Sequence, residues 1–147
     1  TGYQGTLGFG FATALGVKVA RPASPVVAIA GDGGFMYNVQ ELATAIHHRI
    51  PVTCVVSRDD AFGNVKRMQQ DDYGGRVIAS DFTNPAFPAL AESFGAQGLR
   101  ATNADELGAA VEKGLAASVP TIIEVPLGPV PDPWHLIHMP PLPPGDG

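Results

Sequence analysis

Four apolar runs recur along the chain, at residues 25–30, 52–56, 96–100 and 121–125. Three of them are rich in β-branched side chains and lack regular polar alternation, whereas the run at 96–100 is weaker. Unbroken apolar runs of this length are typical of strands that are buried on both faces of a sheet. We therefore expect four strands, of which those at 25–30, 52–56 and 121–125 are buried on both faces of the sheet.

Between these runs the apolar positions have helical spacing, and three helix starts are recognisable. Asn38 followed by Glu41 fits a capping box, and Asn103 followed by Glu106 fits a second one. Residues 83–85, Thr-Asn-Pro, place a cap residue before a proline, which predicts a helix that continues through residue 94.

The order of the elements predicts the fold class. Residues 7–20 are also expected to be helical despite their glycines, so helices and strands alternate along the chain. Such alternation predicts an α/β fold with a mainly parallel sheet and helices on both faces. Ligands of these sheets bind at the carboxyl ends of the strands, so a site is expected in the loops after Ala30 and Val56.

Size and composition fit one ordinary domain followed by a tail. The chain has 147 residues, of which 45% are hydrophobic and 16% charged, so it can bury a core. Prolines crowd the sequence from residue 126, and we interpret 1–125 as the domain and 126–147 as a proline-rich C-terminal tail. The formal net charge of −5 argues against a nucleic-acid or anionic-membrane surface.

The single cysteine and the first residues bear on where the chain belongs. Cys54 lies within an apolar run and is interpreted as a small core residue, not as a nucleophile. One cysteine excludes an internal disulfide, which fits a reducing cytoplasm. The first residues are neither an initiator methionine nor a signal peptide, so we expect the chain to be a fragment of a longer one.

The first candidate loop reads Gly-Asp-Gly-Gly at residues 31–34. Its glycines allow the main chain to turn sharply and to approach a ligand closely. Exposed N–H groups can bind phosphate, and the carboxylate of Asp32 offers a hard oxygen to a divalent cation. Alone, the motif is equally consistent with a strand-to-helix turn capped by an aspartate, and in either case we expect it to face solvent.

The second candidate loop, residues 57–64, follows the next expected strand and carries Asp59 and Asp60. The 24 residues between Gly33 and Arg58 are enough for one crossover helix between parallel neighbours. Two carboxylate-bearing loops that meet at one edge of a sheet favour a metal–phosphate site over two unrelated turns.

The two loops and their spacing resemble the signature of thiamine diphosphate enzymes, with wording closest to the acetolactate synthase and 2-oxo-acid decarboxylase group. Agreement is found at residues 5–10 (GTLGFG), 31–35 (GDGGF), 40–45 (QELATA) and 61–65 (AFGNV). The resemblance implies the thiamine diphosphate-binding fold, with its first strand missing from this chain.

The resemblance also implies a role for each matching position. Asp32 and Asp59 would bind Mg²⁺ through their side chains, and Ala61 would add a main-chain carbonyl. Leu7 would be the bulky residue beneath the bent cofactor; without the resemblance it would be taken as an ordinary core leucine. The implied cofactor-binding residues are Gly5, Thr6, Leu7, Gly31, Asp32, Gly33, Gly34, Asp59, Ala61, Phe62 and Gly63.

One position departs from the family pattern. Arg58 stands where an asparagine is usual, directly before Asp59. Two carboxylates beside a diphosphate concentrate negative charge, which Arg58 would offset if it faced the site and would leave unchanged if it projected away.

These expectations describe part of a lyase or carboligase, similar to acetolactate synthase, that acts on small 2-oxo acids. The resemblance implies thiamine diphosphate and Mg²⁺ as cofactors, a pyrimidine-binding domain from the same or a neighbouring subunit, and a homodimer or homotetramer. The family's catalytic glutamate lies in that other domain, so no catalytic residue is assigned here and the chain alone is expected to be inactive. The alternative is a non-catalytic Mg–diphosphate-binding or regulatory module.

The histidines are interpreted separately. His47 and His48 would lie on the surface at a helix end, where an imidazolium interacts favourably with the helix dipole. His135 and His138 lie in the tail near Trp134, a segment that in the resembling family often folds over the active site.

Overall fold

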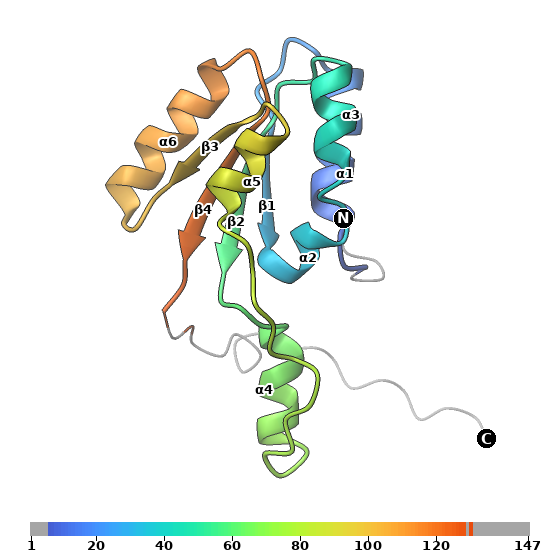
Figure 1. Ribbon diagram of the computed structural model, residues 1–147, viewed down its shortest axis with the longest axis vertical. Coiled ribbons are helices and arrows are strands. Elements are labelled where there is room, and N and C mark those ends of the chain that lie inside the picture. Colours follow the sequence, from blue (N-terminus) through green and yellow to red (C-terminus); the bar gives the residue numbers. More distant parts are fainter. Residues whose placement is uncertain (1–5, 129, 131–147) are drawn as a thin grey trace, which may run out of the picture.

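A parallel sheet forms the centre of the molecule. The computed structural model describes residues 6–128 and 130. Its four strands are β1 (Val27–Gly31), β2 (Thr53–Arg58), β3 (Gln97–Arg100) and β4 (Thr121–Pro126). They pair in the order β1-β2-β4-β3, all parallel (Figure 1). The four expected strands and the α/β fold class are therefore confirmed.

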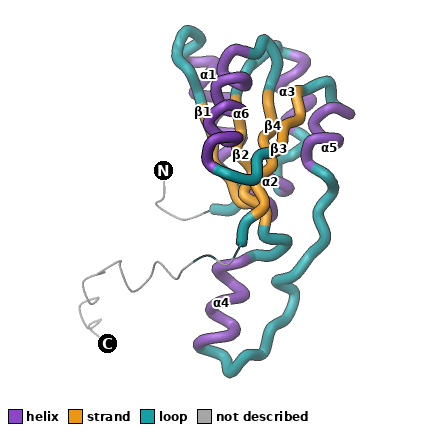
Figure 2. Tube along the Cα trace, turned by 90° about the vertical axis from the view of Figure 1, so that its left-hand side faces the viewer, coloured by secondary structure: helices purple, strands orange, loops and turns teal. Residues whose placement is uncertain are grey.

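Helices connect these strands and cover the sheet. The described helices are α1 (Phe9–Ala20), α2 (Asp32–Met36), α3 (Glu41–His47), α4 (Gly63–Asp71), α5 (Phe87–Ser93) and α6 (Ala104–Ala116). Figure 1 shows α6 apart from α1 and α3, with the strands between them. In Figure 2, α4 extends away from the sheet and a long loop returns from it to α5.

The core has two parts because successive side chains of a strand point to opposite faces. On one face Cys54, Val56 and Ile122 pack against residues of α1, α2, α3 and α5. On the other face Val55 and Ile123 pack against α6. Helices thus cover both faces, as the alternation of elements predicts.

The expectation that residues 25–30 are covered on both sides is wrong. Ala28 is buried, but the neighbouring side chains of Val27 and Ile29 are 43% and 76% exposed. The reason is the position of α6, which contacts β2, β3 and β4 and leaves the adjacent face of β1 open.

The starts of α1 and α3 differ from the sequence-based prediction. The first helix begins at Phe9, because Gly8 before it has a left-handed conformation with φ of 84°. The capping box at Asn38 is not formed, since α3 begins at Glu41 without a side-chain cap and Asn38 Nδ2 donates to Gly8 O at 2.6 Å. Asn38 therefore links two segments of the chain and does not cap a helix.

The capping signal at Asn103 is confirmed. Its side chain accepts a hydrogen bond from Glu106 N at 2.9 Å, and Glu106 Oε2 accepts one from Thr102 N at 2.7 Å.

Among the described residues, no helix is long and apolar enough to cross a membrane.

Cys54 lies in the middle of the sheet and is fully buried. Burial raises the pKa of its thiol to about 12, because the thiolate would lose its hydration. The interpretation as an inert core residue is confirmed.

Gly108 and Gly114 provide a test of how α6 packs on the sheet. A Cβ at Gly114 would lie 2.7 Å from Thr53 Oγ1, whereas a Cβ at Gly108 would meet no atom within 4 Å. We expect Gly114→Ala to lower the free energy of unfolding by about 1–2 kcal/mol through overpacking. Gly108→Ala should raise it by up to about 1 kcal/mol through helix propensity. Denaturant titration of both variants checks this, and equal effects would contradict the packing described.

Candidate functional site

The parallel pairing of β1 with β2 brings the two candidate loops together. Gly31 is in register with Ser57, so the residues that follow each strand meet at the carboxyl edge of the sheet. The main-chain N–H groups of Asp59 and Asp60 donate to Asp32 Oδ2 at 3.1 and 2.8 Å. The predicted juxtaposition of the two loops is thus observed.

Asp32 does not face solvent, which corrects the expectation for this segment. Asp32 is 1% exposed, and residues 32–36 form the short helix α2 and not an open loop. Besides the contacts to Oδ2, its Oδ1 accepts from Gly33 N at 2.7 Å. A buried carboxylate needs such donors because it has lost its hydration.

A residue that the sequence-based interpretation missed joins this site. Asn84 Nδ2 donates to Asp32 Oδ2 at 2.7 Å and to Asp60 Oδ1 at 2.8 Å. The Asn-Pro pair predicts a helix cap, yet α5 begins at Phe87 and has no side-chain cap. Pro88 was the signal in the sequence that could have revealed this. A proline fits the first turn of a helix, so Pro88 is consistent with a helix that starts after Asn84 and leaves its side chain available for other contacts.

Arg58 is held by two acidic residues. Its Nε lies 3.0 Å from Asp60 Oδ1, and its other guanidinium nitrogen lies 3.5 Å from Glu124 Oε2. Glu124 is 2% exposed and also accepts a hydrogen bond from Phe87 N at 3.1 Å. Arg58 therefore pairs with the buried Glu124 of β4 and with Asp60, and no ion pair with Asp59 is found within the described residues.

Asp59 and Asp60 have opposite electrostatic surroundings. Desolvation, followed by the charge of Asp32, raises the pKa of Asp59. The hydrogen bond from Asn84, followed by that from Arg58, lowers the pKa of Asp60. Among the residues that the structure describes, no ion pair joins Asp32 or Asp59 to a cationic side chain, so a cation bound beside these two carboxylates would be favourable.

A cavity of about 460 Å³ adjoins these two carboxylates. Leu7, 54% exposed, forms part of its wall, so it is not an ordinary core leucine. All predicted cofactor-binding residues line this cavity except Thr6, which is exposed but not part of the lining, and Gly5, which lies outside the described residues. The lining consists of Leu7, Gly31, Asp32, Gly33, Gly34, Ser57, Asp59, Ala61, Phe62, Gly63, Asn64, Val65 and Leu127.

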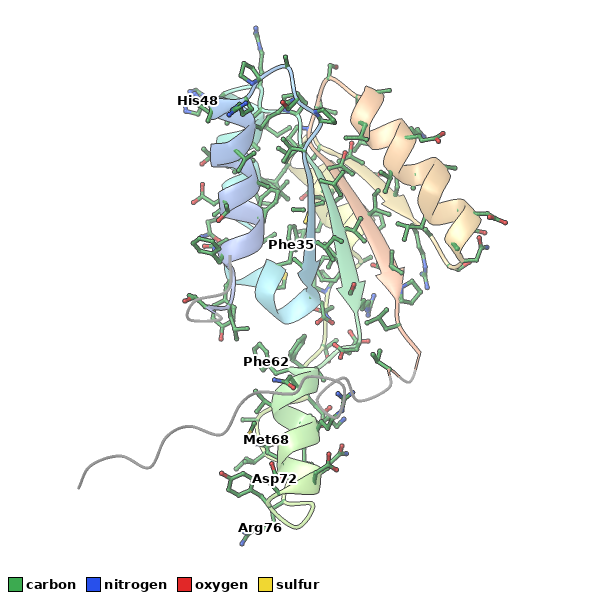
Figure 3. The ribbon with its side chains drawn as sticks, turned by 180° about the vertical axis from the view of Figure 1, so that it is seen from behind. Phe35, His48, Phe62, Met68, Asp72 and Arg76 are labelled. Atoms are coloured by element: carbon green, nitrogen blue, oxygen red, sulfur yellow. The ribbon has the colours of Figure 1, made fainter. Side chains whose placement is uncertain are left out.

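Two glycines are required by close approaches within the site. A Cβ at Gly33 would lie 2.6 Å from the ring of Phe62, which itself packs edge-on against Phe82 with centroids 4.9 Å apart. A Cβ at Gly63 would collide with Asp59 Oδ2. Figure 3 shows Phe62 at the junction between the sheet and α4.

Other candidate groups lie away from this site. His47 and His48 are exposed at the end of α3, as predicted, and His48 lies at the end of the sheet that is farther from Phe62 (Figure 3). His135 and His138 lie outside the described residues.

No three His, Cys, Asp or Glu side chains converge as a metal cluster in residues 6–128. A cation at Asp32 and Asp59 would therefore need further oxygen ligands.

Fold and site together agree with a known family. Residues 1–125 match the family described as thiamine pyrophosphate enzyme, C-terminal TPP binding domain. Because this match covers most of the chain, the chain belongs to that family. The resemblance inferred from the motifs is confirmed.

The similar proteins are enzymes of several activities. The chain is 37% identical over 134 residues to the acetolactate synthase isozyme 2 large subunit of Escherichia coli K12, covering 90% of the chain and 24% of that protein. It is 34% identical over 125 residues to a sulfoacetaldehyde acetyltransferase of Castellaniella defragrans, covering 82% and 21%.

A solved structure supports the same relationship. The thiamine diphosphate-dependent 4-hydroxybenzoylformate decarboxylase of Rhodococcus jostii RHA1 superposes with a TM-score of 0.76 at 31% identity, covering 82% of this chain and 23% of that one. The chain thus spans between a fifth and a quarter of the length of these relatives.

Replacing Arg58 tests its structural role. We expect Arg58→Gln to lower the free energy of unfolding by roughly 1–2 kcal/mol, because buried Glu124 loses a charged partner but keeps Phe87 N–H. Arg100→Gln is the matched control, since Arg100 is 58% exposed and 3.7 Å from the same carboxylate, and its loss should be under about 0.5 kcal/mol. Denaturant titration measures both. Equal losses would show that Glu124 does not depend on Arg58.

Proposed function

We propose that this domain binds the diphosphate of thiamine diphosphate through Mg²⁺, as part of a lyase or carboligase that acts on small 2-oxo acids. The observation that carries the proposal is the meeting of Asp32 and Asp59 at one cavity, with no ion pair to either carboxylate among the described residues. Family membership supports the cofactor, and the similar acetolactate synthases support the reaction class.

The donor set suits Mg²⁺ better than a softer metal. Mg²⁺ prefers hard oxygen ligands and is usually held by one or two carboxylates together with substrate phosphates and water. Asp32 and Asp59 would supply the carboxylates and Ala61 a main-chain carbonyl. Phosphate oxygens would complete the shell, which explains why the protein need not provide a third acidic side chain.

The remaining walls suit the other parts of the cofactor. The first turn of α2 contains Gly33 and Gly34, whose N–H groups have no carbonyl partner earlier in the helix. Both are assigned to the diphosphate, and the Gly33 N–H, which donates to Asp32 Oδ1 in this structure, would have to be shared with it or released. Leu7 offers an apolar surface at the same cavity and is assigned to support the bent cofactor. When bound, the thiazolium ring supplies the electron sink for decarboxylation. This chain's residues would anchor it and exclude water.

The catalytic acid is assigned to another domain. The chain has five glutamates, all within the described residues, and none of them lines the cavity. We propose that a pyrimidine-binding domain from the same or a neighbouring subunit provides the glutamate, within a homodimer or homotetramer.

The metal-binding role of Asp32 can be tested with Asp32→Asn in the full-length protein. This change keeps the side-chain shape and one acceptor, whereas alanine would leave the donors around Asp32 unpaired. We expect the affinity for thiamine diphosphate at fixed Mg²⁺ to fall at least roughly tenfold, equivalent to about 1.4 kcal/mol. The control is Asp105→Asn, at an exposed position of α6. Isothermal titration calorimetry that finds equal affinity in Asp32→Asn and wild type would refute the assignment.

Turnover distinguishes the two candidate functions. The full-length protein with thiamine diphosphate and Mg²⁺ should release carbon dioxide from pyruvate or a related small 2-oxo acid, and chelation by EDTA should abolish the release. Metal-dependent cofactor binding without turnover of any 2-oxo acid would favour the non-catalytic module, for which the unusual Arg58 is the specific observation.

A further inference from the structure

Asn84 reaches the site from a distant part of the chain. It lies in the segment between α4 and α5, 52 residues beyond Asp32, and is 9% exposed. Its amide nitrogen donates to two different carboxylates, Asp32 Oδ2 at 2.7 Å and Asp60 Oδ1 at 2.8 Å. Both hydrogens of the amide are therefore used between acidic groups, an arrangement that a hydroxyl with its single hydrogen cannot reproduce.

The hydrogen bonds of Asp32 are distributed unequally between its two oxygens. Among the described residues, Oδ2 accepts from Asp59 N, Asp60 N and Asn84 Nδ2, whereas Oδ1 accepts from the adjacent Gly33 N alone. Three donors from two other segments thus fix Oδ2, and with it the plane of the carboxylate. The less occupied oxygen, Oδ1, keeps lone-pair capacity for a cation.

We infer that Asn84 is a positioning residue, which orients the Asp32 carboxylate so that Oδ1 is its cation ligand. This inference rests on the proposed function of the site. The neutral amide suits the task, because a lysine or arginine here would compete with the cation and an aspartate would repel both carboxylates. Asn84 itself does not coordinate the cation in this assignment, since its nitrogen faces the carboxylates.

The test compares cation affinity in three variants of the full-length protein. Asn84→Ala removes both hydrogen bonds. Asp60→Ala removes the bond to Asp60 and leaves the bond to Asp32. Asn103→Ala removes an asparagine that caps α6, on the opposite face of the sheet. Mn²⁺ binding without cofactor, followed by electron paramagnetic resonance, and Mg²⁺ titration at saturating thiamine diphosphate provide two readouts that do not depend on activity.

We expect Asn84→Ala to weaken cation affinity by about 10- to 100-fold, the usual effect of losing a partner of a metal ligand. Asp60→Ala and Asn103→Ala should stay within about threefold of wild type, even where they lower the melting temperature. If Asn84 only linked chain segments and had no influence on Asp32, Asn84→Ala and Asp60→Ala would lose cation affinity equally. That result would overturn the inference.

Two further outcomes keep the inference separate from the proposed function. Wild-type protein that binds neither cation nor cofactor overturns both. Wild-type binding with unchanged affinity in Asn84→Ala overturns only the role of Asn84. If Asn84→Ala does not fold, Asn84→Ser, which keeps one donor, takes its place. A partial loss of cation affinity in that variant supports the role, and wild-type affinity refutes it.

Discussion

The site depends on one buried carboxylate that is stabilised by groups from separate segments of the chain. An ionised carboxylate loses its hydration on burial, and this cost is offset only by hydrogen bonds and neighbouring charge. Asp32 receives its bonds from the loop after β2 and from Asn84 before α5. Those donors meet because β1 and β2 are parallel neighbours with Gly31 in register with Ser57. The geometry of the site therefore depends directly on the topology of the sheet.

The charged residues 58–60 are adjacent in sequence but have different partners. Arg58 is adjacent to Asp59 in the chain, yet it pairs with Asp60 and with buried Glu124. Arg58 is the last residue of β2 and Asp59 lies beyond it, so these neighbours in sequence have different surroundings. The arginine thereby satisfies Glu124 without cancelling the charge of Asp32 and Asp59. The departure at Arg58 from the family pattern is thus compatible with a cation site.

The sequence predicts the sheet and the two loops well, because apolar runs and glycine motifs are local signals. It does not predict the uncovered face of β1, since exposure of Ile29 depends on where α6 packs. Nor does it predict Asn38 and Asn84 as links between segments. An asparagine before a helix has the same local pattern whether its amide caps that helix or binds a carboxylate far along the chain. Only tertiary contacts distinguish these roles.

The cavity has two chemical characters, and their separation limits what can fill it. Asp32 and Asp59 form an acidic part, while Leu7, Phe62, Val65 and Leu127 contribute apolar walls. A free metal ion would use only the acidic part, and an uncharged apolar molecule would leave the carboxylates uncompensated. A ligand that joins a metal-bound phosphate group to largely apolar rings would contact both parts at once. The proposed ligand, thiamine diphosphate with Mg²⁺, has this composition, so one ligand would explain both the exposed Leu7 and the buried Asp32.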